Sequence, residues 1–167
     1  MRIRTLLAAV VVSAAVAAPA HAQSAAMLAK HLTTSRDFTL RVAEQMPDAD
    51  YGFKMTAPQM SFAEQMVHLS EEQPGLLGPL AGGAKAGKPA SMKKADVIAF
   101  IRKSYDASIA VVSKLTPDQL SKTYTNGEGS MTGLEMVMFL LDHSTHHRAS
   151  AEMYLRAKGI TPTNYAF

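Results

Sequence analysis

The chain of 167 residues contains no cysteine and no tryptophan. Without cysteine it forms no disulfide, so its stability has to come from core packing, and it offers neither a thiol nucleophile nor a thiolate ligand. A metal ion bound by this chain would meet nitrogen and oxygen ligands, or at most a methionine thioether. Any thiol chemistry would need a thiol that the substrate brings.

Excess charge is also scarce: 17 Lys and Arg face 14 Asp and Glu, a formal net charge of +3. Arg2 and Arg4 supply most of that excess, and the rest of the chain is nearly neutral. No stretch interleaves basic with aromatic residues, as nucleic-acid-binding surfaces do. We therefore expect no nucleic-acid partner.

Only one long hydrophobic run is present, Leu6–Ala18, and it is shorter than the ~20 residues that a membrane-spanning helix needs. Two arginines precede it, and Ala20-His21-Ala22 follows with the small-x-small pattern of a cleavage site. This order is typical of a secretory signal peptide, residues 1–22. We expect residues 23–167 to form one domain that is exported to the periplasm without a stable membrane anchor.

Four segments carry hydrophobic residues at the spacing of amphipathic helices. The first is expected over about 24–45, and the second begins near Pro58 or Ser61 and ends before Pro74. The third and fourth are expected over about 93–115 and 132–158. Ser61 with Glu64 three residues later is a capping-box pattern at the start of the second helix, and Gly159 is placed to end the fourth.

The connections indicate how these helices are ordered. Residues 74–89 are rich in glycine and proline and predict a long crossover loop, whereas residues 48–58 form a shorter, turn-rich link. Residues 116–118 begin a short turn or helical piece, and residues 126–130 are expected to be a loop. No segment alternates like a strand, so the prediction is an all-α four-helix bundle with a crossover between its second and third helices.

The strongest chemical signal is the pair His143 and His147 in the segment LDHSTHHR, residues 141–148. On a helix this spacing puts both imidazoles on one face, one turn apart, where both can bind one ion. The helix is strongly apolar just upstream, so this face is predicted to be buried, and a buried imidazole needs a partner. The alternative is a packed or solvated pair without an ion. His146 is able to replace or join these ligands, but we expect it to point aside.

His68 lies in a second apolar helical segment, residues 62–69. Alone, a histidine on an apolar face is more often a packed core residue. Facing helices of a bundle are, however, where such proteins build metal sites. We therefore predict a metal site made by His68, His143 and His147, with coordination positions left for water or substrate.

Four glutamates accompany these histidines in the sequence. Glu64 and Glu72 stand one turn on either side of His68, Glu71 is nearby, and Glu135 lies about two turns before the histidine pair. Each is able to orient an imidazole or accept a proton. The alternative is that they are exposed acids, which the helix dipole favours near an N-terminus.

Three segments resemble the DinB/YfiT-like superfamily: SFAEQMVH (61–68), LDHSTHHR (141–148) and YLRAKGI (154–160), the last followed by Pro162 and Tyr165. The resemblance covers nearly all of the expected mature chain. It implies a four-helix bundle in up-down-down-up order that holds a divalent ion, whether zinc, nickel, iron or manganese. Carried over, the three ligands are His68, His143 and His147.

Two features depart from the family pattern. The family often continues His-His-Arg with Gly-Gln, where this chain has Ala149-Ser150, a change that removes no ligand. The expected export signal also sets the chain apart from cytoplasmic members. It argues against intracellular thiols such as bacillithiol or mycothiol as co-substrates.

Together these observations predict an exported metalloprotein. Our first hypothesis is a metal-dependent hydrolase or thiol transferase acting on a small molecule, with Glu64, or failing that Glu72, as the base. The alternative is a non-catalytic metal-binding or stress-response module of the cell envelope. A third reading is a structural bundle with packed histidines. The sequence leaves the substrate, the metal and a homodimer open.

Overall fold

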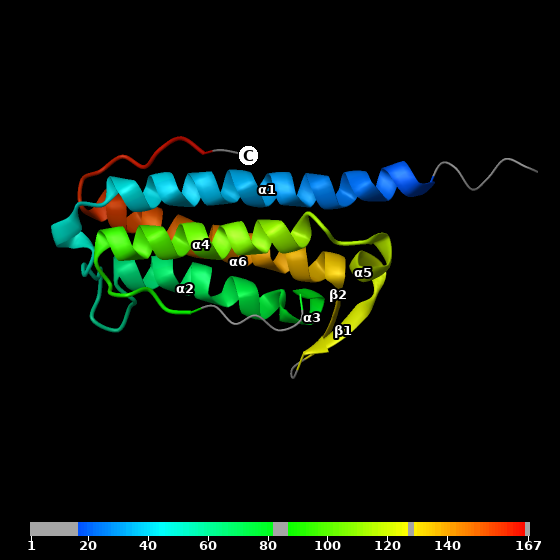
Figure 1. Ribbon diagram of the computed structural model, residues 1–167. Coiled ribbons are helices and arrows are strands. Elements are labelled where there is room, and N and C mark those ends of the chain that lie inside the picture. Colours follow the sequence, from blue (N-terminus) through cyan, green and yellow to red (C-terminus); the bar gives the residue numbers. More distant parts are fainter. Residues whose placement is uncertain (1–16, 82–86, 127–128, 166–167) are drawn as a thin grey trace, which may run out of the picture.

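The computed structural model describes residues 17–81, 87–126 and 129–165 (Figure 1). Within these ranges four long helices form: α1 (Ala17–Gln45), α2 (Phe62–Leu76), α4 (Lys94–Val112) and α6 (Gly133–Ala157). The shorter elements are η1 (Asp48–Asp50), α3 (Gly78–Ala81), α5 (Pro117–Ser121), β1 (Thr123–Asn126) and β2 (Gly129–Thr132).

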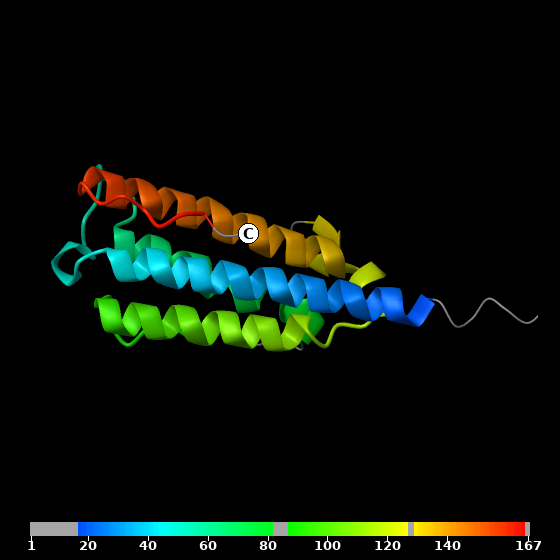
Figure 2. The ribbon, with the colours of Figure 1, turned by 90° about the horizontal axis from the view of Figure 1, so that it is seen from above.

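The long helices form the predicted four-helix bundle. Helix α1 packs against α4 and α6, and α2 packs against the same two helices, so α1 and α2 lie on opposite corners. Helices α1 and α6 run in one direction along the bundle and α2 and α4 in the other (Figures 1 and 2). Because α2 and α4 are parallel, the connection that joins them has to return along the bundle.

Helix α1 begins at Ala17 and therefore continues through the predicted cleavage position after Ala22. Most of the predicted signal peptide, residues 1–16, lies outside the described residues, so export stays a prediction. None of the helices in the described ranges is long and apolar enough to cross a membrane.

Local sequence signals fix the helix ends that position the histidines. The predicted capping box at Ser61 and Glu64 starts α2, and an equivalent box at Thr132 and Glu135 starts α6. Helix α6 ends at Ala157, and Gly159 follows its C-cap residue with a φ of 76°, which suits a residue without a Cβ. There the amide of Ile160 donates to the carbonyl of Leu155 at 2.9 Å, which is the Schellman arrangement.

The prediction that the second helix ends before Pro74 is wrong. Helix α2 continues through Pro74 to Leu76, and Gly78–Ala81 forms the short helix α3. Proline lies in the last turn, where it removes only one backbone donor, and the amide of Leu77 still donates to the carbonyl of Gln73 at 3.2 Å. Residues 82–86 of the predicted crossover loop lie outside the described residues.

The prediction that residues 126–130 form only a loop is also wrong, as is the expectation of no strands. Strands β1 and β2 pair in antiparallel register, with Thr123 opposite Thr132 and Tyr124 opposite Met131. The signal was present, because the threonine- and tyrosine-rich run ends in Asn126-Gly127, a dipeptide typical of tight hairpins. Its strands are too short to show a clear alternation.

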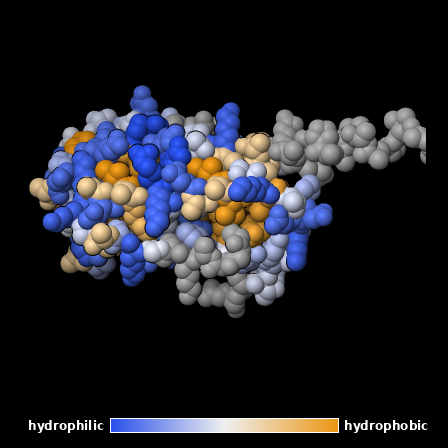
Figure 3. Space-filling model, in the orientation of Figure 1, coloured by the Kyte–Doolittle hydropathy of each residue, from blue (hydrophilic) through white to orange (hydrophobic). Residues whose placement is uncertain are grey.

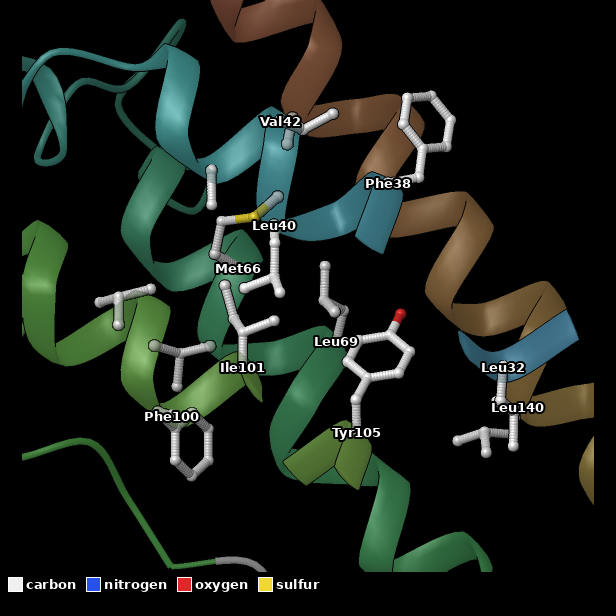
Figure 4. Close-up of a cluster of buried hydrophobic side chains, with 14 of the residues drawn as sticks. Leu32, Phe38, Leu40, Val42, Met66, Leu69, Phe100, Ile101, Tyr105 and Leu140 are labelled. Carbon is white, nitrogen blue, oxygen red and sulfur yellow. The ribbon is translucent and has the colours of Figure 1, made fainter. Parts of the chain in front are cut away.

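The hydrophobic core runs along the bundle axis. Figure 4 shows Met66 and Leu69 of α2 pointing toward Ile101 and Tyr105 of α4, all of them buried. On the face shown in Figure 3 hydrophilic side chains predominate, and the largest hydrophobic area lies near the end of α4. This core fixes the position of α2 relative to α6, and that relative position brings the histidines of the two helices together.

Candidate metal centre

Helices α2 and α6 bring together the three histidines that the sequence singled out. Helix α6 places His143 and His147 one turn apart, with ring centroids 4.6 Å from each other. Helix α2 contributes His68, whose ring centroid lies 5.2 Å from that of His143 and 4.5 Å from that of His147. One ring nitrogen from each residue lies within 4.8 Å of the others, so the three are close enough to hold one ion.

The protein keeps two of these imidazoles neutral. All three side chains are half-buried. Burial lowers the pKa of His147 to about 4, and the neighbouring rings of His143 and His68 add to the effect. Burial also lowers the pKa of His143, with a further contribution from His68. At neutral pH both rings therefore retain a lone pair that a cation can accept.

Gln65 sets the orientation of His147, a role that the sequence analysis missed. Nδ1 of His147 lies 2.7 Å from Oε1 of Gln65. Because a carboxamide oxygen only accepts, the neutral ring carries its hydrogen on Nδ1 and leaves the lone pair on Nε2. The signal lay in the spacing, since Gln65 precedes His68 by three residues and so shares its helix face.

His143 carries an unsatisfied nitrogen. Its Nδ1 is buried and has no hydrogen-bond partner among the described residues. Buried polar atoms are nearly always paired, so an orphan of this kind within a histidine cluster indicates a missing ligand. Neutral rings, a pinned tautomer and an orphaned nitrogen together fit a divalent cation.

Two of the four predicted acids serve as helix caps. A carboxylate oxygen of Glu64 accepts from the amide of Ser61 at 2.6 Å and forms an ion pair with Lys54 at 3.4 Å. Glu135 accepts from the amide of Thr132 at 2.7 Å. The backbone hydrogen bond lowers the pKa of each carboxyl. These contacts give both acids a structural task at a helix start.

The remaining two acids differ from each other. Glu71 forms an ion pair with Lys88 at 3.9 Å. Glu72 is exposed, and its negative charge raises the pKa of His143, against the larger lowering by burial. Of these four acids Glu72 is the one whose charge acts on His143, and Asp142 acts on it in the same direction.

His146 lies beside the cluster but is not part of it. Its side chain is exposed, and its ring centroid is 4.9 Å from that of His147. It is absent from the group of three whose nitrogens converge.

The fold and the cluster define a class: a four-helix bundle in which two facing helices supply three histidines that are close enough to hold one metal ion. The family model of the DinB family matches residues 21–167. The chain belongs to the DinB family.

Known relatives share this architecture at low sequence identity. A crystal structure of a DinB-like protein from Bacillus cereus ATCC 10987 superposes with a TM-score of 0.74 at 16% identity, covering 83% of this chain and 95% of that one. A DinB-like protein of Bacillus subtilis, YjoA, gives a TM-score of 0.69 at 18% identity, covering 83% and 96%. In a sequence comparison YjoA, described as uncharacterized, is 22% identical over 139 residues, 80% of this chain and 90% of its own length.

Proposed function

We propose that this chain is an exported metalloprotein of the DinB family, in which His68, His143 and His147 bind one divalent ion. We further propose that it acts as a metal-dependent hydrolase or thiol transferase on a small molecule. The observation that carries this proposal is the convergence of three ring nitrogens within 4.8 Å, two of them on rings kept neutral by burial.

The residues around the cluster have distinct tasks in this proposal. Gln65 holds the ring of His147 through Nδ1, so that Nε2 faces away from the hydrogen bond. When bound, an ion would supply Lewis acidity to a water or thiol at the positions that three ligands leave open. Three neutral imidazoles add no negative charge, so they leave the charge of such an ion largely uncompensated.

A proton acceptor is the remaining requirement of the enzyme hypothesis. Glu64, our first candidate from the sequence, stays a prediction, but its carboxylate is occupied by Ser61 and Lys54. Glu72 is free of such a cap and interacts electrostatically with His143. We therefore place Glu72 before Glu64 as the proposed base.

One observation favours the non-catalytic alternative, an envelope metal-binding or stress-response module. Within the described ranges none of the three histidines forms an ion pair or hydrogen bond with a carboxylate, and the hydrogen-bond partner of His147 is the neutral Gln65. Storage or buffering of an ion requires no such acid. Activity of Glu72→Gln and Glu64→Gln variants against a substrate screen would separate the two functions.

Elemental analysis of the purified, untagged protein tests the site itself. We expect about one ion per chain in the wild type and almost none in His143→Ala, because two remaining imidazoles bind a divalent ion far more weakly. His146→Ala is the matched control, since it removes an exposed histidine from the same helix. Equal metal content in wild type and His143→Ala would overturn the assignment, and the wild-type metal would choose among zinc, nickel, iron and manganese.

Export is tested separately. Expression of the full chain in a bacterial host, followed by cell fractionation and N-terminal sequencing, should yield a periplasmic protein that begins at Gln23. A protein that retains Met1 in the cytoplasm would contradict this part of the proposal and leave the metal site untouched.

A further inference from the structure

A cavity separate from the histidine cluster lies between α6 and α1. Its volume is about 410 Å³, and its apolar wall is formed by four side chains from these two helices: Met27, Leu28, Met138 and Leu141. Tyr165, on the C-terminal segment that runs back along the bundle, also lines it (Figure 2). None of the three clustered histidines lines this cavity, so it is separate from the metal centre.

The cavity wall includes a buried positive charge, Arg148. This side chain is only 4% exposed. Nη1 donates to the hydroxyls of Ser35 at 2.9 Å and Thr39 at 3.3 Å, and Nη2 donates to the hydroxyl of Thr145 at 3.2 Å. The guanidinium also lies 4.6 Å from the ring centroid of Phe38. The hydroxyl partners are neutral oxygens, and the hydroxyl of Tyr105 is a further neutral partner of the guanidinium.

No carboxylate of the described residues forms an ion pair with Arg148. Glu152, one turn further along α6, acts on it only through longer-range attraction. Asp142 and His31 also line the cavity, and Asp142 is exposed. A buried charge without a direct counter-ion is unfavourable, so an anion placed beside it would be held strongly.

We propose that this cavity binds a small organic monocarboxylate with an apolar body. The carboxylate accepts hydrogen bonds from Arg148, and the apolar body lies against Met27, Met138 and Leu141. A cavity of about 410 Å³ falls within the range of small-molecule sites. A single guanidinium with Asp142 on the same wall favours a singly charged head over a phosphate dianion, which needs more donors.

The two methionines at this site suit such a ligand. Met27 is 53% exposed and Met138 is 55% exposed, although both line the cavity. Methionine side chains are flexible and polarizable, so they adapt to apolar bodies of different shape. Their terminal methyl groups also provide reporters that lie in the cavity rather than at the metal centre.

Octanoate is the probe, and the measurement is methyl NMR of protein labelled at the methionine methyl groups. We expect saturable shifts of the Met27 and Met138 signals, and none at Met92, which is exposed but does not line the cavity. Octan-1-ol has the same chain without the carboxylate, so it should bind about tenfold or more weakly. No shift at either cavity methionine, or equal affinity for the acid and the alcohol, would overturn the proposal.

Two variants locate the binding. Arg148→Met should abolish the preference for octanoate over octan-1-ol. Because that change removes a buried network and is able to disturb folding, Met138→Trp supplies a second test that fills the cavity from an exposed position. Met153→Trp is its matched control, on the same helix, 53% exposed and away from the cavity. Unchanged octanoate affinity in Met138→Trp would overturn the assignment.

Carboxylates also bind metal ions, so the titration is repeated on the His143→Ala variant. Retained octanoate binding there supports the α1–α6 cavity as a separate site. Loss of binding in His143→Ala would place octanoate at the histidine cluster and overturn this inference without affecting the proposed metal site.

Discussion

Buried nitrogen bases on the two sides of helix α6 have opposite protonation states. On the side facing α2, His143 and His147 are neutral because burial lowers the pKa of both imidazoles. On the side facing α1, burial also lowers the pKa of Arg148, but a guanidinium remains charged in proteins. A buried imidazole that has lost its proton can bind a cation through its lone pair. A buried guanidinium keeps its protons, so its N–H groups require hydrogen-bond acceptors.

The partners on each side follow from this difference. Among the described residues His147 forms a hydrogen bond with Gln65, and Nδ1 of His143 has no partner. Arg148 is surrounded by the hydroxyls of Ser35 and Thr39 and the face of Phe38. The first side therefore suits the proposed cation and the second the proposed carboxylate, although the two lie on adjacent faces of one helix.

The largest expected effect is a loss of stability when a hydrogen-bond partner of Arg148, on the side of α6 that faces α1, is removed. Ser35→Ala removes an acceptor of Arg148 and a contact of 3.1 Å with the hydroxyl of Tyr105. Loss of a buried hydrogen bond to a charged group should lower the free energy of unfolding by about 1.5–3 kcal/mol. Urea denaturation measures this, with Ser113→Ala, an exposed serine bonded only to its own helix, as control. If Ser35→Ala lowered the metal content while the free energy of unfolding stayed unchanged, the Arg148 network and the histidine cluster would not be independent.

On the histidine side, Gln65→Leu removes the acceptor that orients His147. We expect metal affinity to fall about 10–100-fold, because partners of ligating histidines contribute that much. Competition with a chromogenic chelator measures the change. Gln65→Glu keeps an acceptor and should bind at least as tightly as wild type. Equal affinity in the leucine variant would show that Gln65 has no orienting role.

A smaller effect is expected for Glu64→Ala. The capping box at the start of α2 loses its carboxylate, and the unfolding free energy should fall by about 0.3–1.5 kcal/mol. Metal content should not change, since Glu64 bonds to Ser61 and Lys54. If instead stability were retained and catalytic turnover lost, Glu64 would act as the base that the sequence first indicated.

The smallest expected effect is the acid sensitivity of the metal-free protein. The unfolded chain protonates its histidines near pH 6.5, whereas His147 in the folded chain protonates only near 4. The unfolded state thus binds more protons below about 6.5, so stability is fully present above that pH and declines as pH falls toward 4. Urea denaturation at several pH values should show this slope, and His147→Gln should reduce it, leaving the contribution of His143, whose pKa burial also lowers. Arg148 keeps its charge throughout this pH range and therefore contributes nothing to the slope. An unchanged slope in His147→Gln would contradict the assignment of the acid sensitivity to His147.

Much of this architecture was readable from local patterns. The four helices and the capping box at Ser61 follow from periodicity and short-range chemistry, which depend on neighbours in the chain. The spacing of His143 and His147 likewise requires only a helix. Pro74 and the hairpin were misread because tertiary packing tolerates a proline in a last turn and stabilises strands of four residues.

The sequence indicated the cap at Glu64 but not the roles of the other acids. Glu71 and Glu72 lie about one turn from His68 and Glu135 about two turns from His143, and only the folded chain shows that Glu135 is occupied by a cap and Glu71 by Lys88. Gln65 was overlooked for the same reason, since its partner lies on another helix, 82 residues away.

The sequence by itself determined the helices, their caps and the three histidines able to bind a metal, because these depend on residue type and on spacing within one turn or one helix. Tertiary structure alone decided that His68 meets His143 and His147 and that Gln65 orients one of them. It also decided that Arg148 is buried beside a cavity and forms no ion pair with a carboxylate of the described residues. Those outcomes depend on which helix faces pack together and on the burial that packing imposes, and both are set by contacts between residues far apart in the chain.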